Sequence, residues 1–597
     1  MKSFWKTVLA VIVGLVIVSV LSLMLMSGFV SALSSGEAKP VVPKSAVLDL
    51  NMSTLTLSEQ SNEPSILASL QSLQGGESRT TIGILKAVQA INAAAEDPAI
   101  KYIYVRPDSF DAGIANLQEL RKALSNFRKS GKAIIAYTEN ATSGAYYLAS
   151  VADKVYMTSY PGATTMFQGV SSQLFFLKDI LDKLGINMQL IRHGKYKAAG
   201  EMYIKNAASA ENLEQNQVLI DAIWSSYTAE MAESRGISEE QINAAIDNLK
   251  LCLPEDFVKE GLIDELLTRE QLQDKITEFA VEEKFSDVKF ISLSDYAEAK
   301  LSPVKATGKI AVIYADGEIV DGSGSEEVAG KRFASIIAKV RADSTVKAVV
   351  LRVNSPGGSV IASDRIKSQL DLLKAEKPLI ASYGGYAASG GYWISNNCDK
   401  IFSDATTITG SIGVFSMIPD FSKLINKTLL VNVTSVNSNK HGDMYTGFRP
   451  LSNDEQEYMQ RSVEDIYERF TTVVSEGRDL DREYVNEIGQ GRVWSGADAL
   501  RIGLVDEIGT LEDALHYAAV CADEPDLSKW CIAEYPKSTS QADQIMELLG
   551  KGGSKDDNVF AGTPLEKTAD IFLDWKNHYK EGSENVYARL PYDIVIK

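Results

Sequence analysis

The sequence predicts an α/β protein in which two copies of one fold follow each other, after an apolar amino-terminal segment. Two observations predict the duplicated fold: motifs that recur at a nearly constant spacing, and short β-branched runs that alternate with amphipathic helices. The length of 597 residues agrees with it, because a single hydrophobic core rarely supports so long a chain. With 45% hydrophobic and 23% charged residues, the composition is that of a globular protein.

The repeat is visible in separate blocks of sequence. Ile100–Arg106 resembles Val346–Arg352, and 246 positions separate the two. Ser143–Tyr156 resembles Ser389–Phe402 at the same spacing of 246. A later block, Gly503–Ile508, repeats one that lies 242 positions before it. Such regular spacing indicates a duplicated unit.

The second copy shows the pattern of elements most clearly. Apolar, β-branched runs predict buried strands at Ile310–Tyr314, Ala348–Val353 and Leu379–Tyr383. Helical periodicity predicts helices over Ser363–Ala375 and Asp454–Gly477. Strands that alternate with helices indicate a parallel sheet covered by helices.

An uncharged, apolar stretch begins the chain, running from Thr7 to Ser35 behind two lysines. A transmembrane helix needs about 20 apolar residues, whereas the core of a signal peptide usually has about 7–15. We therefore expect an uncleaved transmembrane anchor over residues 7–30, with residues 1–6 in the cytoplasm and the rest of the chain outside it. Cleavage near Ser31 is the alternative.

The remainder divides into two domains and a tail. The repeat places one domain at residues 45–300 and the second at residues 307–535. The pattern of elements weakens after Trp530, and residues 536–597 form a tail of unknown role with the composition of a linker in part.

Charge and cysteine content exclude several functions. With 79 acidic against 60 basic residues, the net charge is −19, which argues against nucleic acid as a partner because phosphates must be neutralised by basic residues. The chain has only four histidines and four cysteines, and no cysteine pair has Cys-x-x-Cys spacing, so we expect no metal site and no cofactor. Cys521 and Cys531 could pair, but we favour free, buried thiols.

Two segments of the second copy have the composition of a catalytic site. Asn354–Val360 contains adjacent glycines between a strand and a helix, so its N–H groups suit an oxyanion or a phosphate, although Pro-Gly-Gly is often only a turn. In Ala387–Trp393, Ser389 lies among small residues at a predicted strand-to-helix junction, where its hydroxyl can act as a nucleophile beside the N–H of Gly390. The alternative is that these small residues only allow close helix packing.

A nucleophilic serine needs a base, and none of the four histidines lies in a triad motif. A lysine can take this role if burial lowers its pKa, because desolvation disfavours the ammonium form. Lys197, in Gly194–Gly200, is the candidate, although a lysine is far more often a solvated surface charge.

The two copies differ at the candidate positions. The first copy has Phe110–Ala112 where the second has Pro356–Gly358, so it lacks the glycines that would let backbone N–H groups bind an oxyanion. At a spacing of 246, the second has Asp443 where the first has Lys197, although Lys440 lies close by. Neither copy holds a complete set of groups, and together they hold one.

These motifs resemble those of the signal peptide peptidase A family in its long, double-domain form. The resemblance extends from about Ala46 to about Ala522. The segments that carry it are Val353–Val360, Ala387–Ser395, Thr409–Phe415, Tyr196–Glu201 and Val493–Leu500.

The resemblance implies two crotonase- and Clp-protease-like domains and a serine–lysine dyad that hydrolyses peptides. Ser389 would then be the nucleophile and Lys197 the general base. The N–H groups of Gly358 and Gly390 would form the oxyanion hole, and Ser411 would orient the lysine amine. The family further implies signal peptides as substrates, a homotetramer, and a site on the extracytoplasmic side of the bacterial inner membrane.

Two other functions fit the same sequence. A crotonase-like enzyme acting on acyl-CoA would use a similar pair of amides, and it would bind acyl-CoA without hydrolysing peptides. A non-catalytic membrane scaffold would leave Ser389 inert toward an acylating probe.

Overall fold

The computed structural model describes residues 39–61, 79–160, 162–163, 165–301, 306, 308–324 and 327–537, together with the backbone of the strand Val586–Arg589. The expected anchor at residues 7–30 lies outside the described residues. Among those that are described, no helix combines the length and the apolar character needed to cross a membrane.

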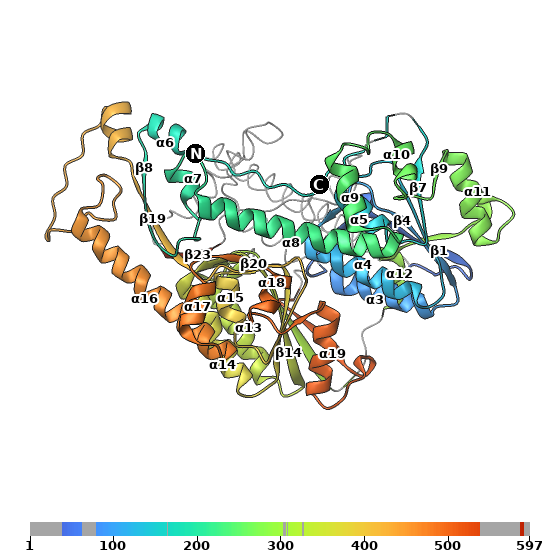
Figure 1. Cartoon of the computed structure of the whole chain (residues 1–597). Coiled ribbons are helices and arrows are strands. Elements are labelled where there is room, and N and C mark those ends of the chain that lie inside the picture. The colour runs from blue at the N-terminus through green and yellow to red at the C-terminus, as the bar shows by residue number, and fades with distance from the viewer. Residues whose placement is uncertain are drawn as a thin grey trace, which may run out of the picture.

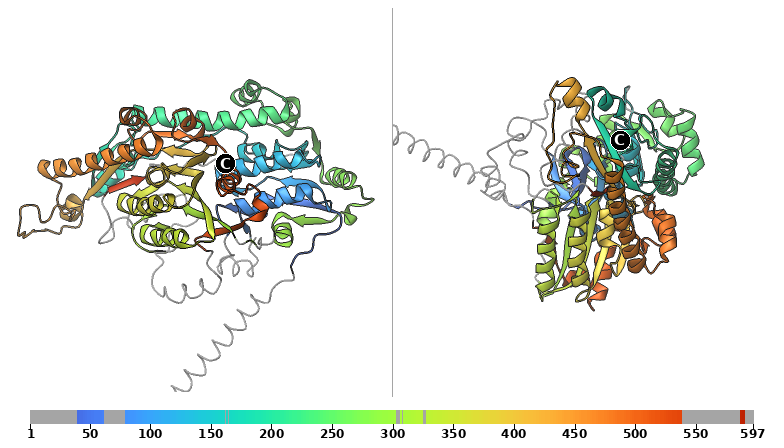
Figure 2. Two further views of the ribbon diagram at one scale, coloured as in Figure 1. Left: turned by 90° about the horizontal axis from the view of Figure 1, so that it is seen from below. Right: turned by 90° about the vertical axis from the view of Figure 1, so that its left-hand side faces the viewer.

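The first half of the chain is built on a parallel sheet of order β10-β1-β4-β6-β7-β9 (Figures 1 and 2). Its strands are β1 (Ala46–Asn51), β4 (Ile100–Arg106), β6 (Ile134–Thr138), β7 (Lys154–Thr158), β9 (Glu265–Leu267) and β10 (Phe290–Ser292). Its helices are α3 (Ile84–Glu96), α4 (Ile114–Arg128), α5 (Ser143–Ala149), α9 (Glu239–Asp247), α10 (Pro254–Lys259), α11 (Arg269–Ala280) and α12 (Leu293–Lys300). A small sheet of β2 (Leu55–Ser58), β3 (Thr80–Gly83) and β5 (Asp111–Ala112) lies beside it.

The second half repeats this design around β20-β18-β16-β14-β11-β22, with β17 and β21 alongside. Its strands are β11 (Lys309–Asp316), β14 (Val346–Ser355), β16 (Leu379–Ala388), β17 (Lys400–Ser403), β18 (Ile408–Gly410), β20 (Val493–Ser495), β21 (Glu507–Ile508) and β22 (Cys531–Tyr535). Its helices are α13 (Gly330–Ala342), α14 (Val360–Lys374), α15 (Gly390–Ser395), α17 (Arg482–Ile488), α18 (Gly496–Arg501) and α19 (Leu511–Cys521). The α/β class and the tandem repeat are thus confirmed.

The predicted elements of the second half are confirmed with small changes at their ends. The helix expected from Ser363 begins at Val360, because the Ser359 side chain caps it by accepting the Ala362 N–H. The sequence pattern weakens after Trp530 and did not predict the strand β22, which begins at Cys531 and pairs with β11.

The four cysteines are free, as expected, but the expectation that they are buried is wrong for three of them. Cys398 is buried, Cys521 and Cys531 are partly exposed, and Cys252 is exposed.

A third sheet joins the two halves, with the order β13-β12-β15-β23-β19-β8. Its strands are β8 (Asn187–His193), β12 (Ile319–Val320), β13 (Val328–Ala329), β15 (Gly357–Ser359), β19 (Val414–Asp420) and β23 (Val586–Arg589). The first half thus supplies β8 to a sheet that is otherwise made by the second half and the carboxyl-terminal strand.

Helix α8 (Ala210–Arg235) also bridges the halves, as Figure 1 shows. Leu219 and Ile223 pack with Ala388 and Val493 of the second half, whereas Tyr227 belongs to the core of the first. Its counterpart α16 (Asn453–Arg478) is also 26 residues long and begins 243 positions later in the sequence. The helices α6 (Lys178–Leu184) and α7 (Glu201–Ile204) flank β8 on either side in the sequence.

A buried charge cluster fixes the junction of the two halves. The fully buried Arg352 guanidinium on β14 lies 2.6 Å from a Glu59 oxygen and 2.8 Å from a Glu119 oxygen, and both glutamates come from the first half. Burial raises the pKa of Glu119, and it raises that of the neighbouring Asp404 well above its usual value. Separating the halves would therefore take away both glutamate partners of this buried guanidinium and leave it only Asp404 of its own half.

Candidate active site

The pairing of β8 with β19 brings the two halves of the candidate site together. The two strands run antiparallel over seven residue pairs, from His193 opposite Val414 to Asn187 opposite Asp420. Lys197 follows the end of β8 by four residues, so this pairing carries it across to the second half.

The loop around Lys197 is held by hydrogen bonds and close packing. The Tyr196 N–H donates to the Gln490 carbonyl at 2.9 Å, and the Arg192 guanidinium donates to the Lys197 carbonyl at 2.7 Å. Gly491 adopts a φ of +78°, and a Cβ on it would lie 2.5 Å from the Lys197 Cβ. The loop can therefore take this position only because residue 491 has no side chain.

Ser389 lies at a sharp turn between β16 and α15. Its φ of 53° and ψ of −112° are unusual for a residue other than glycine, and its N–H donates to the Gly410 carbonyl at 2.8 Å. Ser389 thus lies at a strand-to-helix junction, as the sequence predicted.

The structure brings Lys197, Ser389 and Ser411 into direct contact. The Lys197 Nζ lies 2.8 Å from the Ser389 Oγ, 3.0 Å from the Ser411 Oγ and 3.2 Å from the Ser411 carbonyl oxygen. All three side chains are fully buried. Burial lowers the pKa of Lys197 well below its usual value, because the ammonium form loses its solvation.

Gly358 and Gly390 lie next to each other beside this contact. Gly358 has a φ of +154°, and a Cβ there would come within 1.9 Å of the Ile319 carbonyl oxygen, so no side chain fits. A Cβ on Gly390 would lie 3.1 Å from the Gly358 nitrogen, which shows how closely the two backbones approach. Gly390 is the first residue of α15, so its N–H has no partner within the helix and is available to an oxyanion.

The corresponding site of the first half is closed. The Ser143 hydroxyl donates to the Gly169 carbonyl at 2.9 Å. A Cβ on Gly144 would lie 2.3 Å from the Phe110 ring, so that ring covers the backbone beside the serine. Helices α8 and α16 correspond at a spacing of 243 instead of 246, which moves the counterpart of Lys197 from Asp443 to Lys440. The Lys440 side chain is 72% exposed and pairs with Asp454.

Sequence reasoning missed the groups that position the lysine. The pairing of β8 with β19 joins segments more than 200 residues apart, and no sequence motif predicted it. The Ser411 carbonyl and the packing of Gly491 were also missed. The two glycines at 489 and 491 could have indicated a close backbone approach.

Comparison with known proteins gives the family of the chain. The sequence profile of Peptidase family S49 matches residues 126–282 and 371–523, one segment in each half. Protease 4 of Haemophilus influenzae is 35% identical over 513 residues, which cover 83% of this chain and 82% of that protein. Protease 4 of Salmonella typhi is 35% identical over 77% of this chain and 75% of its own length. The chloroplastic serine protease SPPA of Arabidopsis thaliana is 30% identical over 80% of this chain and 71% of its own.

The fold and these relatives define a serine protease. The chain belongs to peptidase family S49.

A solved structure, a point mutant of ClpP1 from Listeria monocytogenes, superposes on 34% of this chain and 93% of its own, with a TM-score of 0.24 at 17% identity. So low a score supports no conclusion, and the relation to Clp proteases and crotonases stays a prediction.

Replacing Gly491 by alanine should disable the enzyme without unfolding it. The new Cβ would displace the backbone of Lys197, the expected general base, and a shift of about 1 Å in such a group can cost about 100-fold in rate. Gly503→Ala is the matched control, because Gly503 has a similar φ of +80° and only the Leu480 side chain nearby. We expect kcat/KM for a peptide to fall about 100-fold in Gly491→Ala relative to Gly503→Ala, at similar Tm. Equal activity of the two variants would contradict this role of Gly491.

Proposed function

We propose that this serine protease cleaves peptides with a Ser389–Lys197 dyad. The observation that carries the proposal is the 2.8 Å contact between a fully buried lysine amine and a hydroxyl at a strained turn. In the described part of the chain, the amine meets hydroxyl and carbonyl oxygens and forms no ion pair with a carboxylate. Burial therefore favours its neutral form, and a neutral amine can accept a proton.

The mechanism follows from the positions of these groups. Lys197 takes the proton of Ser389, and the Oγ attacks the carbonyl carbon of the substrate peptide. The N–H groups of Gly358 and Gly390 stabilise the oxyanion, where one lost donor typically costs about 2.7–4 kcal/mol in barrier. The protonated lysine then gives its proton to the leaving amine, and water, deprotonated by the same lysine, hydrolyses the acyl-enzyme.

Ser411 holds the lysine amine in line for this transfer. Its hydroxyl and its carbonyl both lie within 3.2 Å of the Lys197 Nζ. A neutral amine can donate two hydrogens to these oxygens and keep its lone pair toward Ser389. Ser411 is therefore a positioning residue.

The proposed substrates are signal peptides left in the membrane after secretion, and other apolar peptides. The family resemblance supports this, as does an Enterococcus faecium relative named as a signal peptide peptidase, which is 34% identical over 46% of this chain. The apolar stretch at residues 7–30 would anchor the chain in the bacterial inner membrane, with both halves on the extracytoplasmic side. The protease relatives speak against an acyl-CoA enzyme and against a non-catalytic scaffold.

Alanine at Ser389 should abolish hydrolysis, whereas alanine at Ser143 should not. Ser143 is the repeat counterpart, equally buried but bonded to a backbone carbonyl instead of an amine. We expect Ser389→Ala to lower kcat on a signal peptide by at least about 1,000-fold, since loss of a nucleophile removes the covalent route. Labelling with a serine-directed acylating probe should disappear in the same variant only. Unchanged turnover in Ser389→Ala would end the dyad assignment.

Activity should fall on the acid side of the pH profile. Lys197 acts as a base only when neutral, so kcat/KM drops as the pH is lowered through the pKa of Lys197 in the free enzyme, and it is restored as the pH rises. Because burial lowers this pKa well below that of an ordinary lysine, the plateau should begin well below about pH 10. The measurement is kcat/KM against pH with an uncharged peptide. A profile that rises only with the pKa of a solvated lysine would contradict the mechanism.

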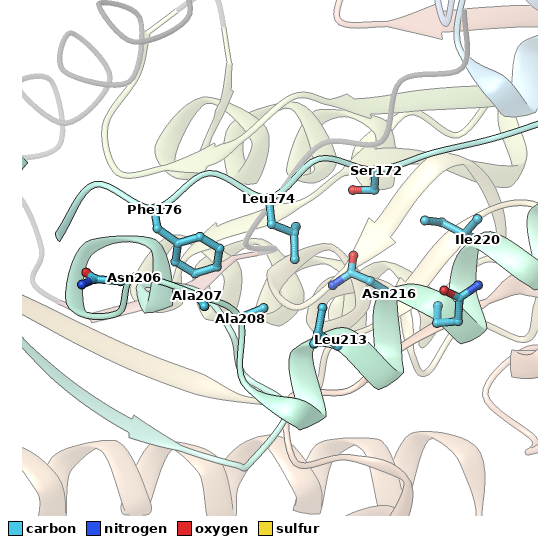
Figure 3. Close-up of a pocket in the computed structure, with 10 residues that line it drawn as sticks. Ser172, Leu174, Phe176, Asn206, Ala207, Ala208, Leu213, Asn216 and Ile220 are labelled. Carbon is cyan, nitrogen blue, oxygen red and sulfur yellow. The ribbon is translucent and has the colours of Figure 1, made fainter. Parts of the chain in front are cut away.

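The repeat also supports the expected homotetramer. Ile191 of β8, which comes from the first half, packs with residues of β19 and α16 of the second half. The counterpart of β19 in the first half is the segment 170–176, which pairs with no strand in the described part of the chain. A pocket of about 440 Å³ lies between this segment and α8, lined by Leu174, Phe176 and Asn216 among others (Figure 3). The buried Asn216 Oδ1 has no hydrogen-bond partner among the described residues.

The occupant that we propose for this pocket is a second copy of the chain. At a spacing of 244, which also relates β19 to the segment 170–176, the counterpart of β8 in the second half is the segment 431–437, in which Val431, Val433 and Val436 are exposed. By the symmetry of the repeat, this segment of one copy would pair with the segment 170–176 of the next. Such a contact joins copies head to tail, and it is satisfied throughout only when the ring closes, here into a tetramer.

Charged residues on this segment should dissociate the assembly while leaving the dyad intact. Val433→Asp together with Val436→Asp would bury two carboxylates in the proposed interface. We expect the mass in light scattering to fall from four chains to one, whereas Asp substitutions at Val258 and Val520, which are also exposed, should leave it unchanged. A monomeric parent chain, or a double variant of unchanged mass, would contradict the proposed contact.

A further inference from the structure

Glu201 is a buried carboxylate that lies four residues after Lys197 in the sequence. It is the first residue of α7, and only 1% of its surface is exposed. Burial tends to raise its pKa, but hydrogen bonds from Ser209 and the charges of two basic side chains lower the pKa below its usual value. Glu201 is therefore an anion at neutral pH. A buried charge is costly unless it is paired, so its partners indicate what it does.

The Arg192 guanidinium connects this carboxylate to the loop around Lys197. Its Nη1 lies 2.7 Å from the Lys197 carbonyl oxygen and 3.2 Å from the Glu201 Oε1, so one nitrogen donates to both. Arg192 itself stands on β8, opposite Phe415 of β19. The carboxylate thus orients the guanidinium, and the guanidinium holds the backbone of the lysine.

The same carboxylate fixes the beginning of α8. Its oxygens accept hydrogen bonds from the Ser209 hydroxyl at 2.8 Å and from the Asn212 amide at 3.2 Å. About one turn further along the helix, the buried Gln215 amide donates to the Tyr196 carbonyl at 3.0 Å. The peptide groups on both sides of the Lys197 Cα are therefore held by side chains that depend on one buried anion.

The repeat provides a comparable carboxylate beside a lysine that is not buried. Glu455, near the start of α16, is 2% exposed and accepts a hydrogen bond from Arg449 at 2.7 Å. Ser452 caps α16 as Ser209 caps α8. Lys440, the counterpart of Lys197, is nevertheless 72% exposed. A buried glutamate–arginine pair at the start of the long helix is common to both halves, so it offers a control for structure without catalysis.

We propose that Glu201 is a positioning residue for the general base, which acts through Arg192 and α8 to hold the Lys197 amine against Ser389. The inference rests on the proposed function, because it takes Lys197 as the base. Without the carboxylate, the guanidinium loses its anionic partner and the Lys197 carbonyl can move. The amine then lies further from the Ser389 Oγ and gains solvent, so proton transfer slows and the pKa of Lys197 rises toward its ordinary value.

Glutamine at position 201 tests this in the full-length chain. We expect Glu201→Gln to lower kcat for a peptide about 100-fold at nearly unchanged KM, because the base is displaced by about 1 Å while the groups that bind the peptide stay in place. The acid limb of kcat/KM against pH should also move to higher pH, which a loss of stability alone would not cause. Glu455→Gln, the control, should lower Tm by a similar amount and keep the parent kcat and acid limb.

A double variant tests whether Glu201 acts through Arg192. Arg192→Met keeps the length of the side chain but removes its donors, so it should reproduce the loss of kcat in Glu201→Gln. If the two residues act as one unit, the double variant should be no slower than the slower single variant. Losses that multiply in the double variant would overturn this connection.

A milder pair of variants makes the same test without leaving a charge unpaired. Ser209→Ala removes the cap of α8 together with a hydrogen bond to Glu201, whereas Ser452→Ala removes only the equivalent cap of α16. The loss of one cap is a small destabilisation, so both chains should fold. We expect kcat to fall about tenfold, and the acid limb to move to higher pH, only in Ser209→Ala.

The outcomes separate this inference from the proposed function. A parent kcat and acid limb in Glu201→Gln and in Ser209→Ala, with Ser389→Ala inactive, would overturn the inference and leave the dyad standing. Equal losses of kcat in Ser209→Ala and Ser452→Ala would also overturn it, because only the first of these serines contacts Glu201. Activity that survives in Ser389→Ala would instead overturn the proposed function.

Discussion

The buried contact between Lys197 and Ser389 depends on the antiparallel pairing of β8 with β19. Seven residue pairs fix that register, and the lysine loop is then held by Gln490, Arg192 and the side-chain-free position 491. Ordering a long side chain and desolvating its amine both cost free energy. The strand pairing and the backbone contacts of the loop offset this cost, because they fix the position of the lysine. The burial that results from these contacts also lowers the pKa of the amine, so the position of Lys197 and its tendency to be neutral have the same cause.

The two halves of the chain have diverged in complementary ways. The second half kept the serine turn and the glycine strand, whereas the first half supplies the lysine and has its own serine covered by Phe110. A site divided in this way is complete only while the halves stay together. The buried Arg352 cluster and helix α8 connect the two halves, so the contact between Lys197 and Ser389 depends on them as well.

Strand addition is the recurring interaction of the third sheet. It joins β8 of the first half to β19 of the second, and it holds the carboxyl-terminal strand β23 between β15 and β19. The first half keeps the corresponding segment 170–176 without a partner strand among the described residues, beside a pocket. The same backbone interaction joins the two halves and would also serve the proposed contact between copies, because main-chain hydrogen bonds do not depend on the side chains they join.

The sequence by itself determined the α/β class, the duplication, the serine turn and the glycine loop. Each of these depends on local periodicity, on the spacing of a repeat or on residues that are close in the chain, such as Gly358 and Ser359 ahead of α14 or Ser389 ahead of α15. Lys197 was found only as the lysine of a family motif, and its buried environment had no local signature. The tertiary structure alone decided that the lysine meets the serine within one chain, that Gly491 makes room for it, and that the strand Val586–Arg589 pairs with β15 and β19. These contacts join segments distant in the sequence, and their register follows from the packing of whole sheets, which no local pattern encodes.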